Sequence, residues 1–97
     1  MEEPAPWAAD RTRFETQLTN SPGEDLVIVT YSAEHSPHDE WVYNRAEIDG
    51  APVVWARDLG TTANAQLITY FDQRKVWILQ ADVLPRVLEA HPDFADR

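Results

Sequence analysis

The sequence predicts a small α/β domain, a three-layer sandwich in which helices cover both faces of a three-stranded, mainly parallel, Rossmann-like sheet. Short apolar runs rich in β-branched residues alternate with longer amphipathic segments, as strands and helices do in α/β proteins. The apolar runs show little polar alternation, which is typical of strands covered on both faces. Buried strands that alternate with helices favour parallel pairing through right-handed crossovers.

The chain has 97 residues, which is the size of one domain. We therefore expect residues 1–97 to form a single domain. Its ends, at residues 1–7 and 91–97, are expected to be frayed, because proline and acidic residues gather there.

The first helix is expected at residues 8–19, where Phe14 and Leu18 lie four residues apart on one helical face. Asp10 would serve as its cap or as an acid in its first turn. A Ser-Pro-Gly sequence then ends the helix, because proline cannot continue it and glycine permits a left-handed exit. The apolar run at residues 26–31 follows and predicts the first strand.

The second strand is expected at residues 52–56 and the third at residues 76–79. Between them, a helix opens after Gly60 and would be capped by one of two adjacent threonines. After the third strand, Asp82 would cap a last helix at residues 82–88.

Residues 32–50 form an irregular crossover, within which residues 39–48 offer a further short strand for an open sheet edge. Trp55 and Trp77 lie inside strands and are expected to pack in the core, each with a partner for its indole N–H. The centres of the strands and the inner face of the second helix predict a buried core of Val27, Val29, Val54, Leu67 and Ile78.

The chain carries 17 acidic residues against 8 basic ones, a formal net charge of −9. Nucleic acids and anionic membrane surfaces are therefore poor partners, since both require clustered basic residues. No apolar run approaches the ~20 residues that span a bilayer, and the first residues lack the pattern of a signal peptide. The absence of cysteine excludes disulfides and thiolate chemistry.

One polar segment after the first strand gathers two imidazoles and two carboxylates, from His35, His38, Asp39 and Glu40. Such groups suit a zinc site or general acid–base catalysis, which makes these four residues the candidates for an enzyme. The alternative is a solvated loop whose polar residues cap the next element. A tetrahedral metal site needs further ligands and no second histidine cluster exists, so we expect neither a metal nor another cofactor.

A candidate binding surface follows from the rule that ligands of open α/β sheets bind beyond the carboxyl ends of the strands. Trp41, Tyr43 and Asn44 follow the first strand, and Arg57 and Asp58 close the second. We expect these residues to share one rim, with the neighbouring acids around Arg57. Aromatic, amide and guanidinium groups together can stack on a sugar and hydrogen-bond it, although they are equally common in protein contacts.

Residues 40–50 (Glu-Trp-Val-Tyr-Asn-Arg-Ala-Glu-Ile-Asp-Gly), 53–58 and 70–77 form a recurring pattern. It resembles the soluble C-terminal region of bacterial multi-pass membrane proteins of the dolichyl-phosphate-mannose-type glycosyltransferase class, across about residues 13–82. The resemblance implies an accessory domain on the extracytoplasmic side of a membrane, either excised or a free-standing relative. It carries over no catalytic residue, because transfer chemistry is expected in the membrane part of such proteins.

Two hypotheses of function follow. The first is a non-catalytic accessory or interaction domain that contacts a sugar, a carrier-lipid phosphate or a partner protein. The second is a small hydrolase or metal-dependent enzyme built on the histidine-containing segment. The location is expected to be extracytoplasmic if the resemblance holds and cytoplasmic for a free-standing chain. An open sheet edge also makes homodimerisation feasible, by strand pairing or by helix packing.

Overall fold

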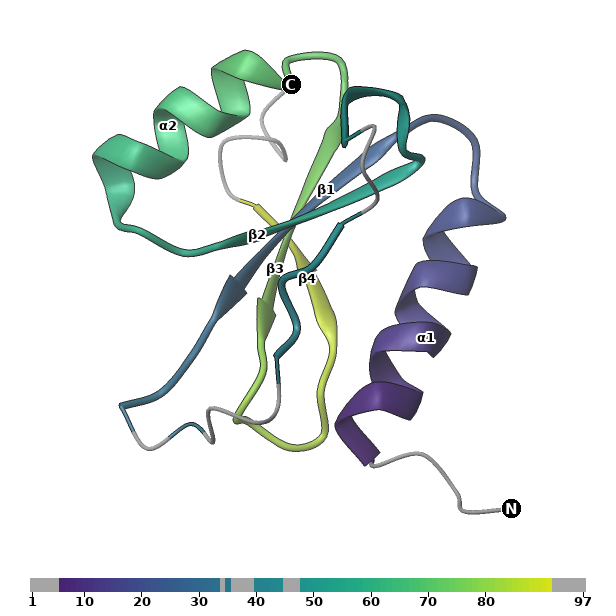
Figure 1. Cartoon of the computed structure of the whole chain (residues 1–97), viewed down its shortest axis with the longest axis vertical. Coiled ribbons are helices and arrows are strands. Elements are labelled where there is room, and N and C mark those ends of the chain that lie inside the picture. The colour runs from purple at the N-terminus through teal and green to yellow at the C-terminus, as the bar shows by residue number, and fades with distance from the viewer. Residues whose placement is uncertain (1–5, 34, 36–39, 45–47, 92–97) are drawn as a thin grey trace.

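The computed structural model describes residues 6–33, 35, 40–44 and 48–91. Its helices and strands alternate as the sequence pattern predicts until the end of the third strand (Figure 1). Their bounds are α1 Pro6–Thr19, β1 Asp25–Thr30, a short 3₁₀ helix Ile48–Gly50, β2 Val53–Arg57, α2 Thr61–Tyr70, β3 Lys75–Gln80 and β4 Leu88–Ala90.

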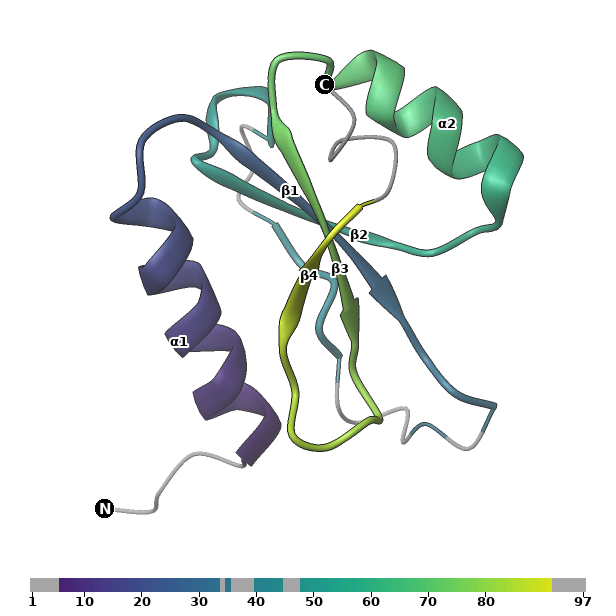
Figure 2. The same cartoon turned by 180° about the vertical axis from the view of Figure 1, so that it is seen from behind.

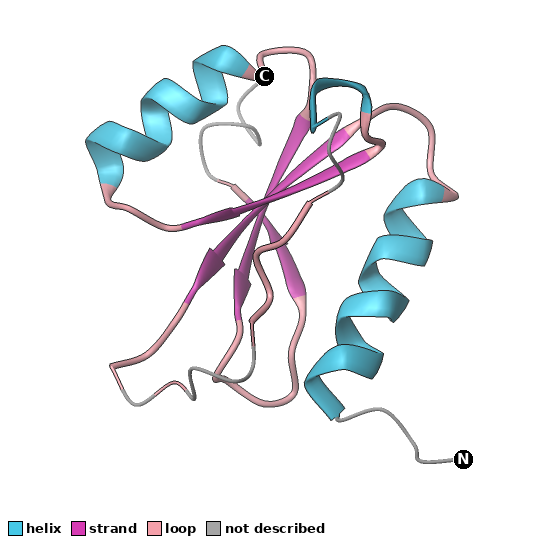
Figure 3. Cartoon of the chain, viewed as in Figure 1, coloured by secondary structure: helices cyan, strands magenta, loops and turns pink. Residues whose placement is uncertain are grey.

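The strands, drawn in magenta in Figure 3, form one open four-stranded sheet. Their order in the sheet is β2-β1-β3-β4. β1 is parallel to both β2 and β3, whereas β4 is antiparallel to β3. β1 is therefore paired along both edges, with Leu26 opposite Val54 on one side and Val76 on the other. This central place explains why its apolar run shows no polar alternation.

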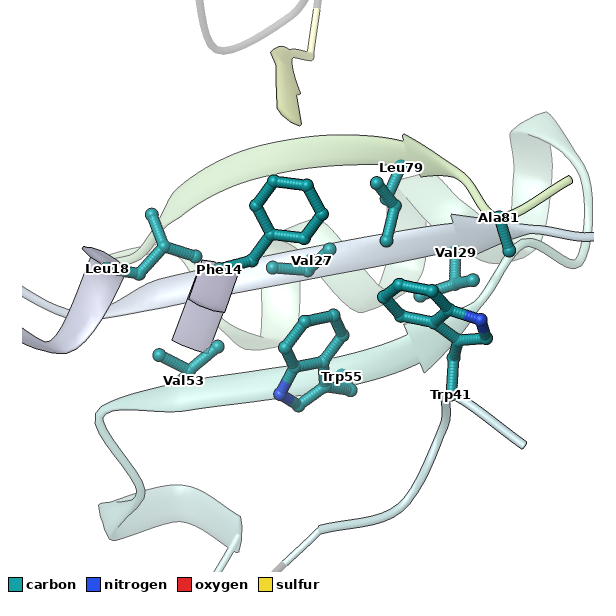
Figure 4. Packing of buried hydrophobic residues seen from close by; sticks show 9 residues of the cluster. All are labelled: Phe14, Leu18, Val27, Val29, Trp41, Val53, Trp55, Leu79 and Ala81. Carbon is teal, nitrogen blue, oxygen red and sulfur yellow. The ribbon is translucent and has the colours of Figure 1, made fainter. Parts of the chain in front are cut away.

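The two helices cover opposite faces of the sheet (Figures 1 and 2). Side chains of successive strand residues point to opposite faces, so β1 contributes to two apolar clusters. The cluster on the α1 face comprises Phe14, Leu18, Val27, Val29, Trp41, Val53, Trp55, Leu79 and Ala81 (Figure 4). The cluster on the α2 face comprises Leu26, Ile28, Ala51, Val54, Ile68, Phe71 and Val76.

The α/β class is confirmed, but the sheet is mixed and has a fourth strand. The helix predicted at residues 82–88 does not form, and turns there lead into β4. Asp82 cannot cap a helix because its carboxylate accepts the backbone N–H of Ser32 at 2.8 Å and binds His35 at 2.6 Å. The fourth strand therefore comes from the C-terminal part of the sequence. The suggested strand in the crossover is absent from its described residues, 40–44 and 48.

The caps also differ from the prediction. The N-cap of α2 is Gly60 rather than a threonine, at a φ of 98° that favours glycine. The carboxylate of Asp58 orders this turn by accepting the N–H of Gly60 at 3.0 Å and the side-chain amide of Asn64 at 2.8 Å. Asp10 lies beyond the first turn of α1, and its carboxylate instead accepts a hydrogen bond from Arg86 at 2.9 Å.

Three of the five predicted core residues, Val27, Val29 and Val54, are buried, which confirms the strand centres. Leu67 and Ile78 are only partly buried, so the prediction was wrong for them. Val76, near the beginning of β3, belongs to the cluster on the α2 face together with Ile68 and Phe71, and Leu67 packs at the margin of that cluster. Ile78 lies two residues further along the same face and is not part of the cluster.

We expect Val54→Ala to lower the free energy of unfolding by about 2 kcal/mol, because two buried methyl groups are lost and a cavity remains. Val87→Ala is the matched control, since the same atoms are removed from a side chain that is 55% exposed. That variant should stay within about 0.5 kcal/mol of the original chain. Urea unfolding followed by circular dichroism measures both, and equal losses would contradict the placement of β2.

Asp25 is a carboxylate buried at the beginning of β1, with no exposed surface. Its Oδ1 accepts the indole N–H of Trp77 at 3.0 Å and lies 3.8 Å from Nζ of Lys75. No donor from the described part of the chain reaches Oδ2. Burial raises the pKa of Asp25, and the bond from Trp77 and the charge of Lys75 only partly oppose it.

This raised pKa gives Asp25 a defined effect on stability. Between the ordinary pKa of 3.8 and the raised value, the native state binds more protons than the unfolded chain. The contribution of Asp25 to stability therefore falls as the pH rises through this window. Asp25→Asn keeps an acceptor for Trp77 without the charge, so the variant should gain stability relative to the original chain between about pH 3 and about pH 7.

Parallel urea titrations of the two chains across this pH range measure the difference. Glu40 and Asp58 have lowered pKa values and make both chains less stable in acid, so their effect cancels in the comparison. If the difference in the free energy of unfolding between the two chains stays constant across this pH range, or reverses its sign, the charge of Asp25 does not destabilise the native state.

Candidate functional site

The predicted binding residues do not form one surface. Trp41 has no exposed surface, and its ring centroid lies 6.1 Å from those of both Trp7 and Trp55 (Figure 4). It therefore packs in the core of the α1 face and offers no ring face to a ligand. Tyr43 and Asn44, two and three residues further along, lie instead beside the outer edge of β2.

Arg11 of α1 organises this region. Its guanidinium carbon lies 3.6 Å from the ring centroid of Tyr43 and 4.3 Å from that of Trp55. Nε donates to the carbonyl of Trp41 at 2.8 Å, and Nη2 donates to the carbonyl of Tyr43 at 2.6 Å. Arg11 is only 4% exposed, and burial lowers its pKa, whereas the nearby carboxylate of Glu15 acts in the opposite direction. An arginine remains protonated at neutral pH, so these are charge-assisted hydrogen bonds.

Arg11 is not among the site residues predicted from the sequence, although its spacing along α1 contains a signal. Arg11, Phe14 and Leu18 recur at intervals of three and four residues, so they share one helical face. All three are buried. A cation within an apolar stripe must find partners in the interior, because an unpaired buried charge is costly. Arg11 finds them in the carbonyl groups of the crossover.

Asn44 occupies the outer edge of β2. Its side-chain amide donates to the carbonyl of Trp55 and accepts the N–H of the same residue, both at 2.8 Å. These are the two bonds that a neighbouring strand would make with Trp55. Asn44 thus satisfies the centre of an edge strand that would otherwise present unpaired backbone groups.

A cleft lies between α1 and the edge of β2, with a volume of about 420 Å³. Tyr43 stands at its wall with 55% of its surface exposed, while Arg11 packs against its ring. The carboxylate of Glu15 makes two weak contacts with cleft groups. Its Oε2 lies 3.7 Å from Nη1 of Arg11, and its Oε1 accepts the indole N–H of Trp55 at 3.5 Å. The lining residues are Arg11, Thr12, Glu15, Thr16, Thr19, Asn20, Tyr43, Asn44, Ala51, Pro52, Val53 and Trp55.

A second polar cluster lies at the carboxyl ends of β1 and β3. Nδ1 of His35 lies 2.6 Å from Oδ1 of Asp82, and the imidazole stacks on Tyr31 with 4.1 Å between ring centroids. Burial acts to raise the pKa of Asp82, but hydrogen bonds from His35 and from the N–H of Ser32 outweigh it and lower the pKa. The pair connects the loop after β1 to the loop after β3.

Glu40 and Tyr31 form the other half of this cluster. The carboxylate of Glu40 accepts the hydroxyl of Tyr31 and the N–H of Val42, each at 2.9 Å. The N–H of Val42 is the main cause of the lowered pKa of Glu40. Burial, together with the bond to Glu40, raises the pKa of Tyr31 to about 12. His38 and Asp39, the other two candidates for catalysis, lie outside the described residues.

Arg57 belongs to this strand-end cluster and does not line the cleft. Its guanidinium carbon lies 5.4 Å from the ring centroid of Tyr31, and its charge helps to lower the pKa of Glu40. Asp58 faces the other way, because its carboxylate accepts hydrogen bonds from Thr30 and from the beginning of α2. The candidate residues are thus divided between two places on the molecule.

Within the described ranges, no group of three or more acidic or histidine side chains is arranged to bind a metal ion. No helix among them is both long enough and apolar enough to cross a bilayer. Comparison of the chain with protein-family models, curated proteins and solved structures finds no match. The fold and the cleft alone therefore describe this protein: it is a small α/β domain with an open polar and aromatic cleft beside an edge strand.

Proposed function

We propose that this chain is a non-catalytic interaction domain and that the cleft between α1 and β2 is its binding site. The observation that carries the proposal is the arrangement of Tyr43, whose ring packs against Arg11 and is still 55% exposed at the cleft. An aromatic group already fixed in place loses little conformational entropy when a ligand binds. The volume of about 420 Å³ lies within the range of small-molecule sites, roughly 300–1,000 Å³.

The role that agrees with the sequence resemblance is that of an accessory domain in a glycosyltransferase-like membrane protein. In this role the cleft recognises a component of the reaction, a carrier or a neighbouring protein, and the chemistry occurs elsewhere. The division of the polar residues supports a role without catalysis. Asp82, Glu40 and Tyr31 use their polar atoms to connect loops at the strand ends, and His35 is not among the described residues that line the cleft.

A screen by amide NMR spectroscopy with a library of small polar and aromatic fragments tests the binding site. We expect the fragments that bind to shift the backbone signals of Tyr43 and Asn44 and the indole signal of Trp55. Tyr43→Ala should weaken these fragments by roughly tenfold, since an aromatic contact contributes on the order of 1 kcal/mol.

Tyr70→Ala is the matched control, because Tyr70 is similarly exposed, at 65%, and does not line the cleft. A melting curve of each variant establishes that it folds. The proposal fails if the fragments shift signals remote from the cleft, or if both tyrosine variants bind equally well. It also fails if the purified chain turns over a hydrolase substrate and loses this activity in His35→Gln.

A further inference from the structure

We infer that the ligand of the cleft is an uncharged sugar ring, which stacks on Tyr43 and is hydrogen-bonded by α1. This inference rests on the proposed function and names the class of ligand. It depends on three features of the cleft: its balanced charge, a row of hydroxyl groups, and a strand edge that is already occupied.

The charge of the cleft favours a neutral ligand. Among the described residues that line it, the charged ones are Arg11 and Glu15, one of each sign, and they lie 3.7 Å apart. Arg11 directs Nε and Nη2 at backbone carbonyl groups, so these donors are not available to a phosphate. The chain as a whole carries a net charge of −9, which further opposes an anion. Among the described lining residues, a sugar phosphate would therefore meet one cation, Arg11, which is already paired with Glu15 and with two carbonyl groups.

The wall formed by α1 presents a row of hydroxyl groups. Thr12, Thr16 and Thr19 recur at intervals of four and three residues, all are exposed, and all line the cleft. Glu15 lies among them with its carboxylate only loosely engaged. A threonine hydroxyl both donates and accepts hydrogen bonds, as a sugar hydroxyl does, and a carboxylate accepts from neighbouring hydroxyls. This row therefore complements a polyol better than it complements an anion, which brings acceptors alone.

The strand edge excludes the common mode of peptide binding. A peptide that adds a strand to a sheet requires free N–H and C=O groups along the edge. At the centre of β2 both groups of Trp55 are already bonded to Asn44. An extended peptide in the cleft would thus lose its central pair of backbone hydrogen bonds. The ring face of Tyr43 and the hydroxyls of α1 remain as the contacts of the site.

Amide NMR titrations of the whole chain test the inference. The probes are methyl glucoside, methyl galactoside and methyl mannoside, the phosphate esters of glucose and mannose, and glycerol as a simple polyol. We expect at least one of the glycosides to shift the signals of Tyr43, Asn44 and Thr16, while the phosphate esters and glycerol shift them much less. Thr16→Val should weaken the glycoside by roughly fivefold, because one hydrogen bond is lost. Thr62→Val, an exposed threonine of α2, is the matched control and should bind as the original chain does.

The outcomes separate the two proposals. Glycoside binding that requires Tyr43 and Thr16 supports the inference. Equal or tighter binding of the phosphate esters in the same cleft would overturn the inference but would agree with the proposed interaction domain. Fragment binding in the cleft without any response to sugars would have the same meaning. If glycosides shift only signals remote from the cleft, the inference is wrong. If neither fragments nor sugars shift any cleft signal, both proposals fail.

Discussion

Trp41→Ala is expected to lower the free energy of unfolding by about 4 kcal/mol. The ring has no exposed surface and lies between Trp7 and Trp55 on the α1 face of the sheet. It also connects the irregular crossover to the core, so its removal leaves a large cavity and detaches this segment from the strands. Chemical denaturation followed by far-ultraviolet circular dichroism measures the loss.

Trp41→Phe is the informative control. Phenylalanine retains most of the ring and removes the indole N–H of Trp41, which has no acceptor in the described part of the chain. A buried donor without a partner is costly, so its removal offsets part of the lost packing. We expect this variant to lose only about 1 kcal/mol. Similar losses for the alanine and phenylalanine variants would show that the structure depends on the N–H group rather than on the ring.

The elements that the sequence predicts well are those in which local pattern and tertiary position agree. The apolar run at residues 26–29 is buried on both faces because β1 is the inner strand and an apolar cluster covers each of its faces, and this is the arrangement that such a run indicates. The helix around Phe14 and Leu18 also forms as its apolar spacing predicts. These elements need no partner from a distant part of the chain to fix their type.

The segment after β3 shows where local pattern fails. Residues 82–88 combine a capping residue, a proline in the first turn and apolar residues at helical spacing. The carboxylate of Asp82 is instead engaged by the loop after β1, fifty residues earlier in the chain. The side chains of Val83, Leu84 and Val87 stay exposed, so a helix here would have had no apolar surface to cover. A hydrogen bond between distant segments, from Ser32 to Asp82, thus favours the turns over a helix at residues 82–88. The local sequence pattern does not reveal hydrogen bonds of this kind.

The candidate site was predicted in part. Tyr43 and Asn44 lie at the cleft, but Trp41 is in the core and Arg57 is at the strand ends. A tryptophan in an irregular segment looks exposed because no periodic pattern surrounds it. Its burial depends on α1, which supplies the opposite wall through Trp7. The rule that ligands bind beyond the carboxyl ends of the strands points to the end of the sheet, whereas the cleft lies along the outer edge of β2.

Arg11→Met is expected to lower the free energy of unfolding by about 3 kcal/mol, since two charge-assisted hydrogen bonds to backbone carbonyls are lost. Methionine is apolar and of similar length, so the packing of this α1 side chain against Trp55 is largely retained. Arg13→Met is the matched control on the same helix. The side chain of Arg13 is 60% exposed, pairs with Asp10 at 3.4 Å and lies 4.7 Å from the ring centroid of Phe14, and exposed contacts of this kind contribute little, so this variant should change stability by less than about 0.5 kcal/mol.

The same substitution separates the fold from the site. Without the guanidinium, the carbonyls of Trp41 and Tyr43 lose their donor and the ring of Tyr43 loses its support. Amide hydrogen exchange at residues 42–44 should therefore accelerate more than exchange in β1, which keeps its pairing on both sides. If exchange rises uniformly, Arg11 stabilises the whole domain and does not position the cleft. A local increase, with weaker fragment binding in a chain that still folds, would assign to Arg11 the positioning of Tyr43.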